Sequence, residues 1–459
     1  MVHSNTTTVN ILEVVRVSPP PATDSLTLPL TFFDLGWLKL HPVDRVLFYR
    51  VPELTRSSLL AKLKSSLSTT LLHYLPLAGR LVWDLTNTKP SIVYSPDDDD
   101  AVYLTVAESN GDLTRLARDE PRPATAFHPL VPELHVSNES TRVFAVQITF
   151  FSNQGFCLGL TAHHAVLDGK TISMFLKAWS HNCKQEQQEC GLDAALPHDL
   201  IPFMDRTVVQ DPTGIATKLL TRWVSASNNK RSLKMFPSKV IGDDVVRVTL
   251  RLTLENIQKL RERVLERRAE MHLSTFVITY AYVITCMVKA RGGDPTRLVC
   301  VGFASDFRSR LNPPLPSTYF GNCIVGSGDF DLKAEPILEE GEGKGFVSAV
   351  KSVSGWVKGL CPENIEESML SPFEAFKRME PGRQMISVAG STRLGIYGSD
   401  FGWGKPVKVE IVTIDKDESV SLSESGDGTG GVEIGVCLKK DDVERFGSLF
   451  STGLKKLNI

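Results

Sequence analysis

FCLGLTAHHAVLDG, residues 156–169, is the stretch that decides the fold. It opens with an apolar, strand-like run, and a similar run, VFAVQITFF, occupies residues 143–151. Only the turn-forming sequence Ser-Asn-Gln-Gly at 152–155 separates the two runs, so together they predict a buried β-hairpin. Residues 170–181 then follow the helical period, which predicts a helix shortly after the second strand.

The same stretch carries a candidate general base. His164 and Asp168 lie four residues apart, beyond the strand and before Gly169, where a side chain can project into a cleft. An imidazole titrates near neutral pH, so it can take a proton from a hydroxyl, and a nearby carboxylate can fix its tautomer or organise the loop. A buried histidine bonded to a backbone carbonyl would show the same spacing, and that alternative stays open. A metal site at His163, His164 and Asp168 is not expected, because no further ligand motif accompanies them.

Composition restricts the classes of function. The chain has 459 residues, a formal charge of −2, 42% hydrophobic and 23% charged residues, which is typical of a soluble globular protein of two or three domains. It has no basic block, so we expect no nucleic-acid partner. The eight cysteines form no C-x-x-C pair and are expected to be reduced. Neither a targeting segment nor 18 successive apolar residues is found, so we expect a cytoplasmic protein that binds small molecules and no membrane.

Hydrophobic periodicity divides the chain into two α/β halves. Residues 57–72 place leucines four apart and predict an amphipathic helix. We interpret the polar, proline-containing segment at 183–240 as a crossover between an N-terminal domain, residues 1–182, and a C-terminal domain, residues 241–459. In the second half, strands are expected near 298–304, 383–389, 407–414 and 431–438, and helices near 254–268, 274–291 and 440–456.

Three motif matches do not indicate the sites that such motifs usually form, which are a kinase metal site, a dinucleotide-binding loop and a calcium loop. The DFG at 400–402 matches a kinase metal-binding triad, but no H-R-D loop or V-A-I-K strand accompanies it. The glycines at 426, 428 and 431 spell G-x-G-x-x-G, yet a strand-like sequence follows in place of a helix, so we expect a hairpin loop. The acidic run at 97–100 lacks the spaced oxygen ligands of a calcium loop and is expected to be solvated.

Two motifs taken together resemble the BAHD family of plant CoA-dependent acyltransferases. They are HxxxDG at 164–169 and DFGWG at 400–404. The likeness covers nearly the whole chain, including LTLPLTFFDLGWL at 26–38 and HYLPLAGRL at 73–81. YFGNC at 319–323 resembles the branch that acylates anthocyanin and other phenolic glycosides, and the phenolic glucoside malonyltransferases are the closest likeness, through LSTFV at 273–277, KARGGDP at 289–295 and SVAGSTR at 387–393. The resemblance implies an α/β, two-domain chloramphenicol-acetyltransferase-like fold with mixed sheets and an active-site channel between the domains.

The resemblance also implies roles for the motif residues. His164 becomes the general base. Asp168 points away from the cleft and pairs with an arginine, for which Arg308 is the candidate, while Gly169 completes the loop. A second group shapes the channel without touching substrate, although its aspartate is also a candidate proton acceptor: Asp400, Gly402, Trp403 and Gly404.

Substrate-binding residues follow from the chemistry of the substrates. Ser274 and Thr275 cap a buried helix, and a helix N-terminus suits an anionic phosphate of CoA. Ser391 or Thr392 is the candidate donor to the developing oxyanion. A malonyl donor carries a free carboxylate, which calls for a cation; Arg393 is the first candidate, ahead of three others, Arg308, Arg310 and Lys170.

The expected function is transfer of malonyl from malonyl-CoA to a sugar hydroxyl, the primary 6-hydroxyl, of a phenolic or flavonoid glucoside. We expect a monomer with malonyl-CoA as co-substrate and no tightly bound cofactor or metal. One alternative keeps the fold and His164 but uses hydroxycinnamoyl-CoA or acetyl-CoA. Another is a binding protein that has lost turnover, and the intact motifs argue against it.

Overall fold

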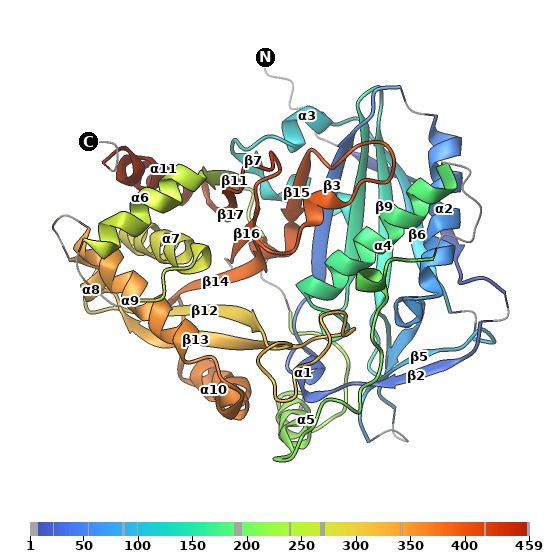
Figure 1. Cartoon of the computed structure of the whole chain (residues 1–459), viewed down its shortest axis with the longest axis horizontal. Helices are drawn as coiled ribbons and strands as arrows, with labels where there is room; N and C mark the ends of the chain where they lie inside the picture. Colours follow the sequence, from blue (N-terminus) through green and yellow to red (C-terminus); the bar gives the residue numbers. More distant parts are fainter. Residues whose placement is uncertain are drawn as a thin grey trace.

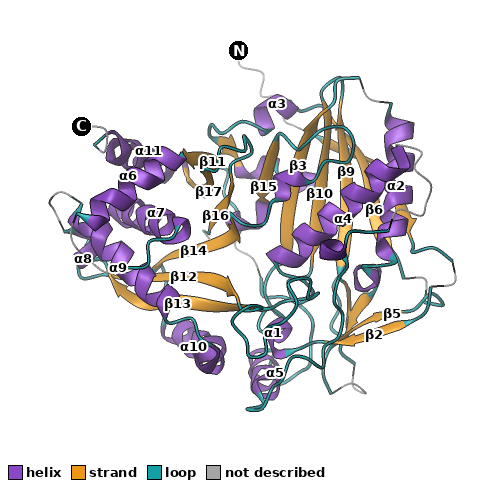
Figure 2. Ribbon diagram, in the orientation of Figure 1, coloured by secondary structure: helices purple, strands orange, loops and turns teal. Residues whose placement is uncertain are grey.

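Three β-sheets and eleven α-helices make up the described parts of the computed structural model, which are residues 8–21, 23–53, 55–84, 88–98, 100–187, 195–237, 240–266, 271–339, 341, 343–416 and 419–456 (Figures 1 and 2). The first domain contains a six-stranded sheet, in the order β1 (Val9–Val17), β6 (Val102–Ser109), β9 (Phe144–Phe151), β10 (Gly155–Ala162), β3 (Val43–Arg50) and β15 (Lys408–Ile411). A four-stranded sheet lies beside it, in the order β2 (Leu26–Pro29), β5 (Ser91–Tyr94), β4 (Arg80–Val82) and β8 (Ser140–Arg142).

The predicted hairpin and its neighbouring helices form the core of this domain. β9 and β10 pair antiparallel, and every position in both strands is buried. Helices α2 (Arg56–Leu71) and α4 (Gly169–Gln187) lie together in front of the sheet in Figure 1. Their apolar faces are at most 2% exposed and share a core with the strands, which confirms both predicted helices: Leu59, Leu63, Leu67, Leu71, Ile172, Phe175, Leu176 and Trp179.

The second domain is a seven-stranded mixed sheet covered by helices. Its order is β13 (Ile324–Lys333), β12 (Leu298–Asp306), β14 (Gln384–Ser391), β16 (Val420–Glu424), β17 (Val432–Lys439), β11 (Val245–Leu252) and β7 (Arg122–Pro123). Helix α7 (Thr275–Arg291) is buried from Val277 to Val288, as expected for a helix with so little polar surface. Around it in Figure 1 lie α6 (Leu254–Leu265), α9 (Lys344–Lys358) and α11 (Lys440–Lys455).

Two segments cross between the sheets, so a cut at residue 241 does not separate the two domains. β15 belongs to the C-terminal half of the chain but pairs with β3 in the first sheet, and β7 pairs with β11 in the second. The strand pattern at 407–414 predicts a strand but not its neighbour, because period-two alternation is a local signal. The DFGWG motif just before β15 therefore lies against the first domain, where Phe401 is buried in the core.

The segment at 183–240 is less irregular than its prolines suggest. It contains α5 (Ile215–Ala226), whose Leu219 and Trp223 are buried. Trp223 donates its indole N–H to the carbonyl of Leu35 at 2.7 Å, which fastens α5 to α1 (Phe32–Leu35). The glycines at 426 and 428 lie in the loop between the antiparallel strands β16 and β17, so the expected hairpin is confirmed. The remaining helices are α3 (Leu113–Leu116), α8 (Glu335–Leu338) and α10 (Ile365–Arg378).

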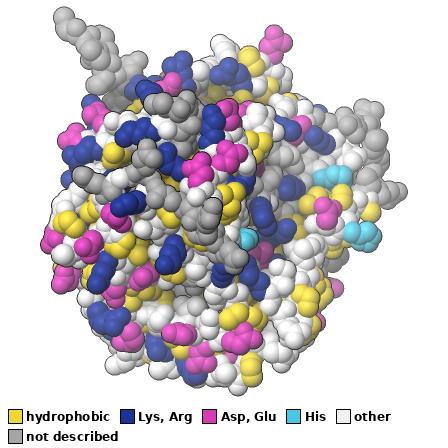
Figure 3. All heavy atoms as spheres, turned by 60° about the vertical axis from the view of Figure 1, so that its left-hand side comes forward, with side chains coloured by type: hydrophobic (Ala, Val, Ile, Leu, Met, Phe, Trp, Pro, Cys, Tyr) yellow, Lys and Arg dark blue, Asp and Glu magenta, His cyan; other side chains and the backbone are white. Residues whose placement is uncertain are grey.

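Charges of both signs are interspersed on the face drawn in Figure 3. Within the described ranges, every helix is too short or too polar to span a lipid bilayer.

Candidate active site

The loop after β10 carries two histidines in different surroundings. His163 is fully buried, and its Nδ1 accepts the backbone N–H of Ala165 at 3.2 Å. Burial, with smaller effects from His164 and Lys39, lowers the pKa of His163 to about 3. His164 is half-buried and stacks on Trp37, with ring centroids 4.3 Å apart and planes 14° apart. Trp37 therefore fixes the plane of the half-buried imidazole.

The imidazole of His164 is held in its neutral form. Burial, helped by the positive charge of Arg45, lowers the pKa of its imidazole to about 4, although the Asp168 carboxylate acts in the opposite direction. Its Nδ1 is buried and has no hydrogen-bond partner among the described residues. Near neutral pH the imidazole is therefore unprotonated, with Nε2 left to meet a substrate.

Both carboxylate oxygens of Asp168 accept hydrogen bonds from the protein. Its Oδ1 accepts the N–H of Thr171 at 3.0 Å and caps the start of α4. Its Oδ2 accepts Arg308 Nη1 at 2.8 Å and the N–H of Cys323 at 3.2 Å. Burial alone would raise the pKa of Asp168, but the Arg308 guanidinium and these backbone donors hold it below its usual value. The expected pair is present, and Asp168 is tied to the interior of the protein.

Arg308 fastens the histidine loop to the YFGNC segment. Besides Asp168, its guanidinium donates to the carbonyls of Tyr319 at 3.1 Å and Gly321 at 2.9 Å. It is 3% exposed, and although burial opposes its charge, Asp168 and Asp306 raise its pKa above the ordinary value. The arginine thus crosslinks two loops from opposite halves of the chain.

Asn322 holds the backbone of the base itself. Its Nδ2 donates to the carbonyl of His164 at 2.9 Å and to Asp34 Oδ1 at 3.2 Å, and its backbone N–H donates to the same carboxylate oxygen at 2.9 Å. Asp34 is in turn bound by Arg206 at 3.3 Å. Asp34 lies in the stretch LTLPLTFFDLGWL and Asn322 lies in YFGNC. Neither residue could be assigned a role from the sequence, since a buried polar pair leaves no periodic signal.

The DFGWG motif is a capped turn away from the imidazole. Asp400 Oδ1 accepts the backbone N–H groups of Gly402 at 2.8 Å and Gly404 at 3.0 Å, and both glycines have positive φ, 98° and 92°. Asp400 Oδ2 binds Lys184 at 2.7 Å. Burial would raise the pKa of Asp400, but Lys184 and the glycine N–H groups lower it. Trp403 packs edge-on against Phe156, with centroids 6.3 Å apart.

Comparison with known proteins agrees with this geometry. The family model described as the Transferase family matches residues 7–452. The chain belongs to the BAHD family. It is 80% identical over 99% of its length, and 100% of the relative's, to an Arabidopsis thaliana malonyl-CoA:anthocyanidin 5-O-glucoside-6''-O-malonyltransferase. Phenolic glucoside malonyltransferase 1 of the same plant is 48% identical over 97% of this chain and 98% of its own.

The fold of this BAHD protein also agrees with solved structures. Vinorine synthase matches with a TM-score of 0.69 at 20% identity, over 95% of this chain and 96% of the other. At that identity the likeness shows the fold, an α/β arrangement of two domains with mixed sheets, and nothing about substrates.

The expected CoA residues of this BAHD protein lie at accessible positions. Ser274 and Thr275 are half-buried at the start of α7, and Ser274 Oγ caps the helix by accepting the N–H of Val277 at 3.3 Å. Ser391 and Thr392 are half-buried at the end of β14, and Ser391 Oγ accepts the N–H of Arg393 at 3.3 Å. Arg393 itself is exposed. Lys170 and Arg310 are exposed as well, and Arg308 is occupied by Asp168.

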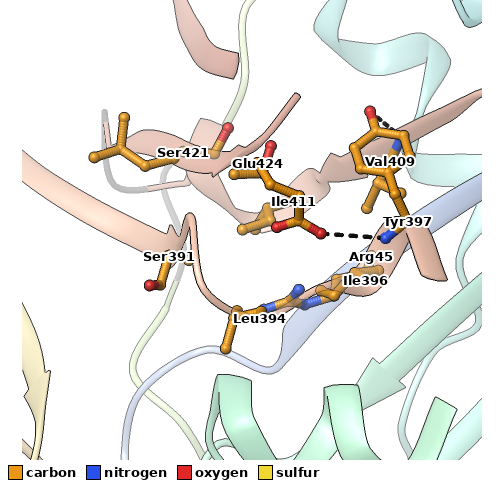
Figure 4. Close-up of a pocket in the computed structure, with 12 residues that line it drawn as sticks. Arg45, Ser391, Leu394, Ile396, Tyr397, Val409, Ile411, Ser421 and Glu424 are labelled. Atoms are coloured by element: carbon orange, nitrogen blue, oxygen red, sulfur yellow. Dashed lines mark hydrogen bonds between the residues drawn. The ribbon is translucent and has the colours of Figure 1, made fainter. Parts of the chain in front are cut away.

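A small cavity adjoins the histidine loop, and its lining includes one arginine and one glutamate that no sequence motif had indicated. Arg45 of β3 lines it together with Ser391, Leu394 and Glu424 (Figure 4). A Cβ atom on Gly169 would lie 3.1 Å from Leu394 and 3.7 Å from an Arg45 nitrogen, so the glycine of the HxxxDG motif forms part of the same surroundings. Arg45 stands in an ordinary strand pattern, which gave no reason to single it out.

Proposed function

We propose that the protein transfers the malonyl group of malonyl-CoA to the 6-hydroxyl of a glucose carried by an anthocyanidin or related phenolic. The observation that carries the donor and acceptor classes is the 80% identity, over 99% of the chain, to a relative named for this reaction. The neutral, half-exposed imidazole of His164 supplies the base that an ester-forming transfer from a thioester needs.

The chemistry runs through one base. His164 Nε2 takes the proton of the sugar 6-hydroxyl while the oxygen attacks the thioester carbonyl. The resulting tetrahedral centre collapses, the new C–O bond remains, and the C–S bond breaks. The imidazolium then returns its proton to the CoA thiolate, so His164 ends the cycle neutral. Its lowered pKa favours that last step, because a weakly basic imidazole is a strong acid once it is protonated.

Other residues position the reactants. Asp168 and Arg308 hold the loop of the base from behind, and Asn322 fixes its carbonyl. Asp400 is a positioning residue as well, since its two oxygens are occupied by Lys184 and two glycine N–H groups. We assign the CoA phosphates to the region of Ser274 and Thr275.

The oxyanion of the tetrahedral centre needs a donor that is already in place. The hydroxyl of Ser391 is a suitable donor, since its oxygen accepts the N–H of Arg393 and its own proton has no acceptor among the described residues. Thr392, the next residue, is the second candidate.

The test is a competition assay with purified protein. An anthocyanidin 5-O-glucoside is offered with equimolar malonyl-CoA, acetyl-CoA and coumaroyl-CoA, and products are separated by mass. We expect one dominant product, heavier by a single malonyl group, with fragmentation placing it on the glucose. Coumaroylated product would move the protein to an aromatic donor while leaving His164 as base. No product with any donor, while CoA still binds, would favour a binding protein without turnover.

We also propose a cytosolic monomer. Seven described cysteines are free, six of them buried, which agrees with a reducing compartment. Imaging of a fluorescent fusion and light scattering of the purified protein test these two points separately.

A further inference from the structure

Arg45 is an exception among the buried arginines. Five arginines of the described chain are less than 9% exposed: Arg45, Arg122, Arg206, Arg247 and Arg308. The last four each have a carboxylate within 3.3 Å. Arg45 is 4% exposed, forms no ion pair with any described residue, and its Nε has no hydrogen-bond partner in the described chain.

An uncompensated buried cation is costly. Removing a guanidinium from water without a partner destabilises a protein by several kcal/mol, so such groups are rarely left unpaired. The cost appears in the pKa of Arg45, which burial lowers to about 10 although the Glu424 carboxylate acts in the opposite direction; in Arg206 and Arg308 the partner carboxylates overcome burial and raise the pKa. The four paired arginines serve the fold, and Arg45 lacks the partner that would explain it in the same way.

The position of Arg45 is at the junction of the two domains. Arg45 lies on β3, where it pairs with Leu160 of β10 on one side and with Ile411 of β15 on the other. His164 follows Leu160 by four residues, so Arg45 lies beside the strand that leads to the base. The cavity that it lines is closed from the second domain by Ser391 of β14 and Glu424 of β16. In Figure 4 the guanidinium extends toward Leu394, with Glu424 on the opposite wall. Its charge also reaches His164, whose pKa it helps to lower.

The dimensions suit a small anionic group. The space open to the centre of a water molecule is about 20 Å³, which is somewhat more than the 10–15 Å³ that a single buried water needs. A carboxylate is of this order of size, and a hydroxycinnamoyl ring is far larger. Ser391, the candidate donor to the oxyanion, lines the same cavity, so the proposed oxyanion site and the guanidinium of Arg45 face one shared space.

We propose that Arg45 binds the free carboxylate of the acyl donor and thereby selects malonyl-CoA over uncharged acyl-CoAs. This proposal rests on the function proposed above and names the residue that sets its donor specificity. A guanidinium can bind a carboxylate through two parallel hydrogen bonds, a geometry that an ammonium group cannot reproduce. Glu424 acts in the opposite sense, because its second carboxylate oxygen is also buried and unpartnered and repels a donor anion. The two residues together tune the affinity for the donor.

The test compares malonyl-CoA with acetyl-CoA, which differ only in the carboxylate. Arg45→Met keeps an unbranched side chain and removes the guanidinium with its charge; we expect kcat/KM for malonyl-CoA to fall about 100-fold or more and that for acetyl-CoA to change less than about 3-fold. Arg45→Lys should have a kcat/KM for malonyl-CoA between those of the wild type and Arg45→Met, because the positive charge remains but the two parallel hydrogen bonds of the guanidinium are lost. Glu424→Gln should raise kcat/KM for malonyl-CoA. Arg393→Met, at the exposed rival position, should leave the donor ratio unchanged.

A binding measurement needs no acceptor and keeps the proposal separate from the proposed function. Malonyl-CoA should raise the Tm of the wild type more than acetyl-CoA does, and Arg45→Met should abolish this difference between the two donors. If Arg45→Met lowered kcat/KM equally for malonyl-CoA and acetyl-CoA, Arg45 would have a structural role only. If Arg393→Met abolished the preference for malonyl-CoA over acetyl-CoA, Arg393 would be the residue that binds the carboxylate. A wild type that prefers an uncharged donor would instead overturn the proposed function.

Discussion

Asp168 and Asp400 each accept several hydrogen bonds and bind one cation, but in different surroundings. Asp168 and Arg308 have side chains only 0% and 3% exposed, whereas Asp400 and Lys184 are 23% and 41% exposed. The first pair lies behind the loop that bears His164, and the second closes a turn near the surface. Both motif aspartates are thus bound by groups of the protein itself, and of the two only Asp168 is tied to the buried loop that carries His164.

The largest effect should come from the base itself. His164→Ala is expected to lower kcat about 1,000-fold without lowering Tm, because general base catalysis contributes roughly 100- to 10,000-fold. The measurement is initial rate with saturating donor, together with thermal unfolding. His163→Asn is the matched control: its amide oxygen can still accept the N–H of Ala165, so turnover should persist. Unchanged turnover in His164→Ala would contradict the base assignment.

The buried pair of Asp168 and Arg308 should have the largest effect on the free energy of unfolding. Arg308→Met leaves Asp168 charged and unpaired, and breaking such a buried pair costs about 3–5 kcal/mol in the free energy of unfolding. Asp168→Asn keeps the carbonyl oxygen that Thr171 needs and should cost less. Urea unfolding of both variants and of the double variant gives the coupling between the two side chains. A double variant that loses the sum of the single losses would show that the pair is not coupled.

Acid should destabilise the buried loop before the exposed turn. The pKa of His163 is about 3 in the folded protein and near 6.5 when unfolded, so the unfolded chain binds the extra proton between those values. The free energy of unfolding should therefore be greatest above about pH 6.5 and fall, on the order of 4 kcal/mol from this group alone, as the pH drops toward 3.

The pH dependence is measured by urea unfolding between pH 4 and 7. His163→Asn should reduce the slope of the profile by about half, because His164, whose folded pKa is about 4, still takes up a proton on unfolding in this range. Asp400→Asn should leave most of the slope unchanged, since the pKa of Asp400 is already lowered below its usual value. An equally steep profile in His163→Asn would assign the proton to another group.

The smallest effect is expected at the exposed turn. Asp400→Asn keeps an oxygen for the N–H groups of Gly402 and Gly404 and loses only the pair with Lys184, so the free energy of unfolding should fall by about 1 kcal/mol or less. Lys184→Met should match it. Turnover should change by no more than a few fold, with an unaltered pH profile. A 100-fold loss of kcat with a shifted profile would restore the proton-acceptor role of Asp400.

Local patterns predicted the elements around the site well. The hairpin of β9 and β10, the buried face of α2 and the buried helix α7 all follow from periodicities of two and 3.6 residues, which adjacent residues fix among themselves. Helix α5 was missed, since prolines and polar residues around it hide a short apolar face. The pair between Asp168 and Arg308 came from the family likeness and could not have come from spacing.

The sequence by itself determined the family, the α/β class and the placement of His164 after a buried strand, because motif spacing and side-chain periodicity are local properties of the chain. Only the tertiary structure decided which sheet β15 joins, that Asn322 reaches Asp34 across 288 residues, and that Arg45 alone among the buried arginines of the described chain forms no ion pair with a carboxylate. These are pairings between distant residues, and burial and charge compensation at each depend on the neighbours that folding brings together.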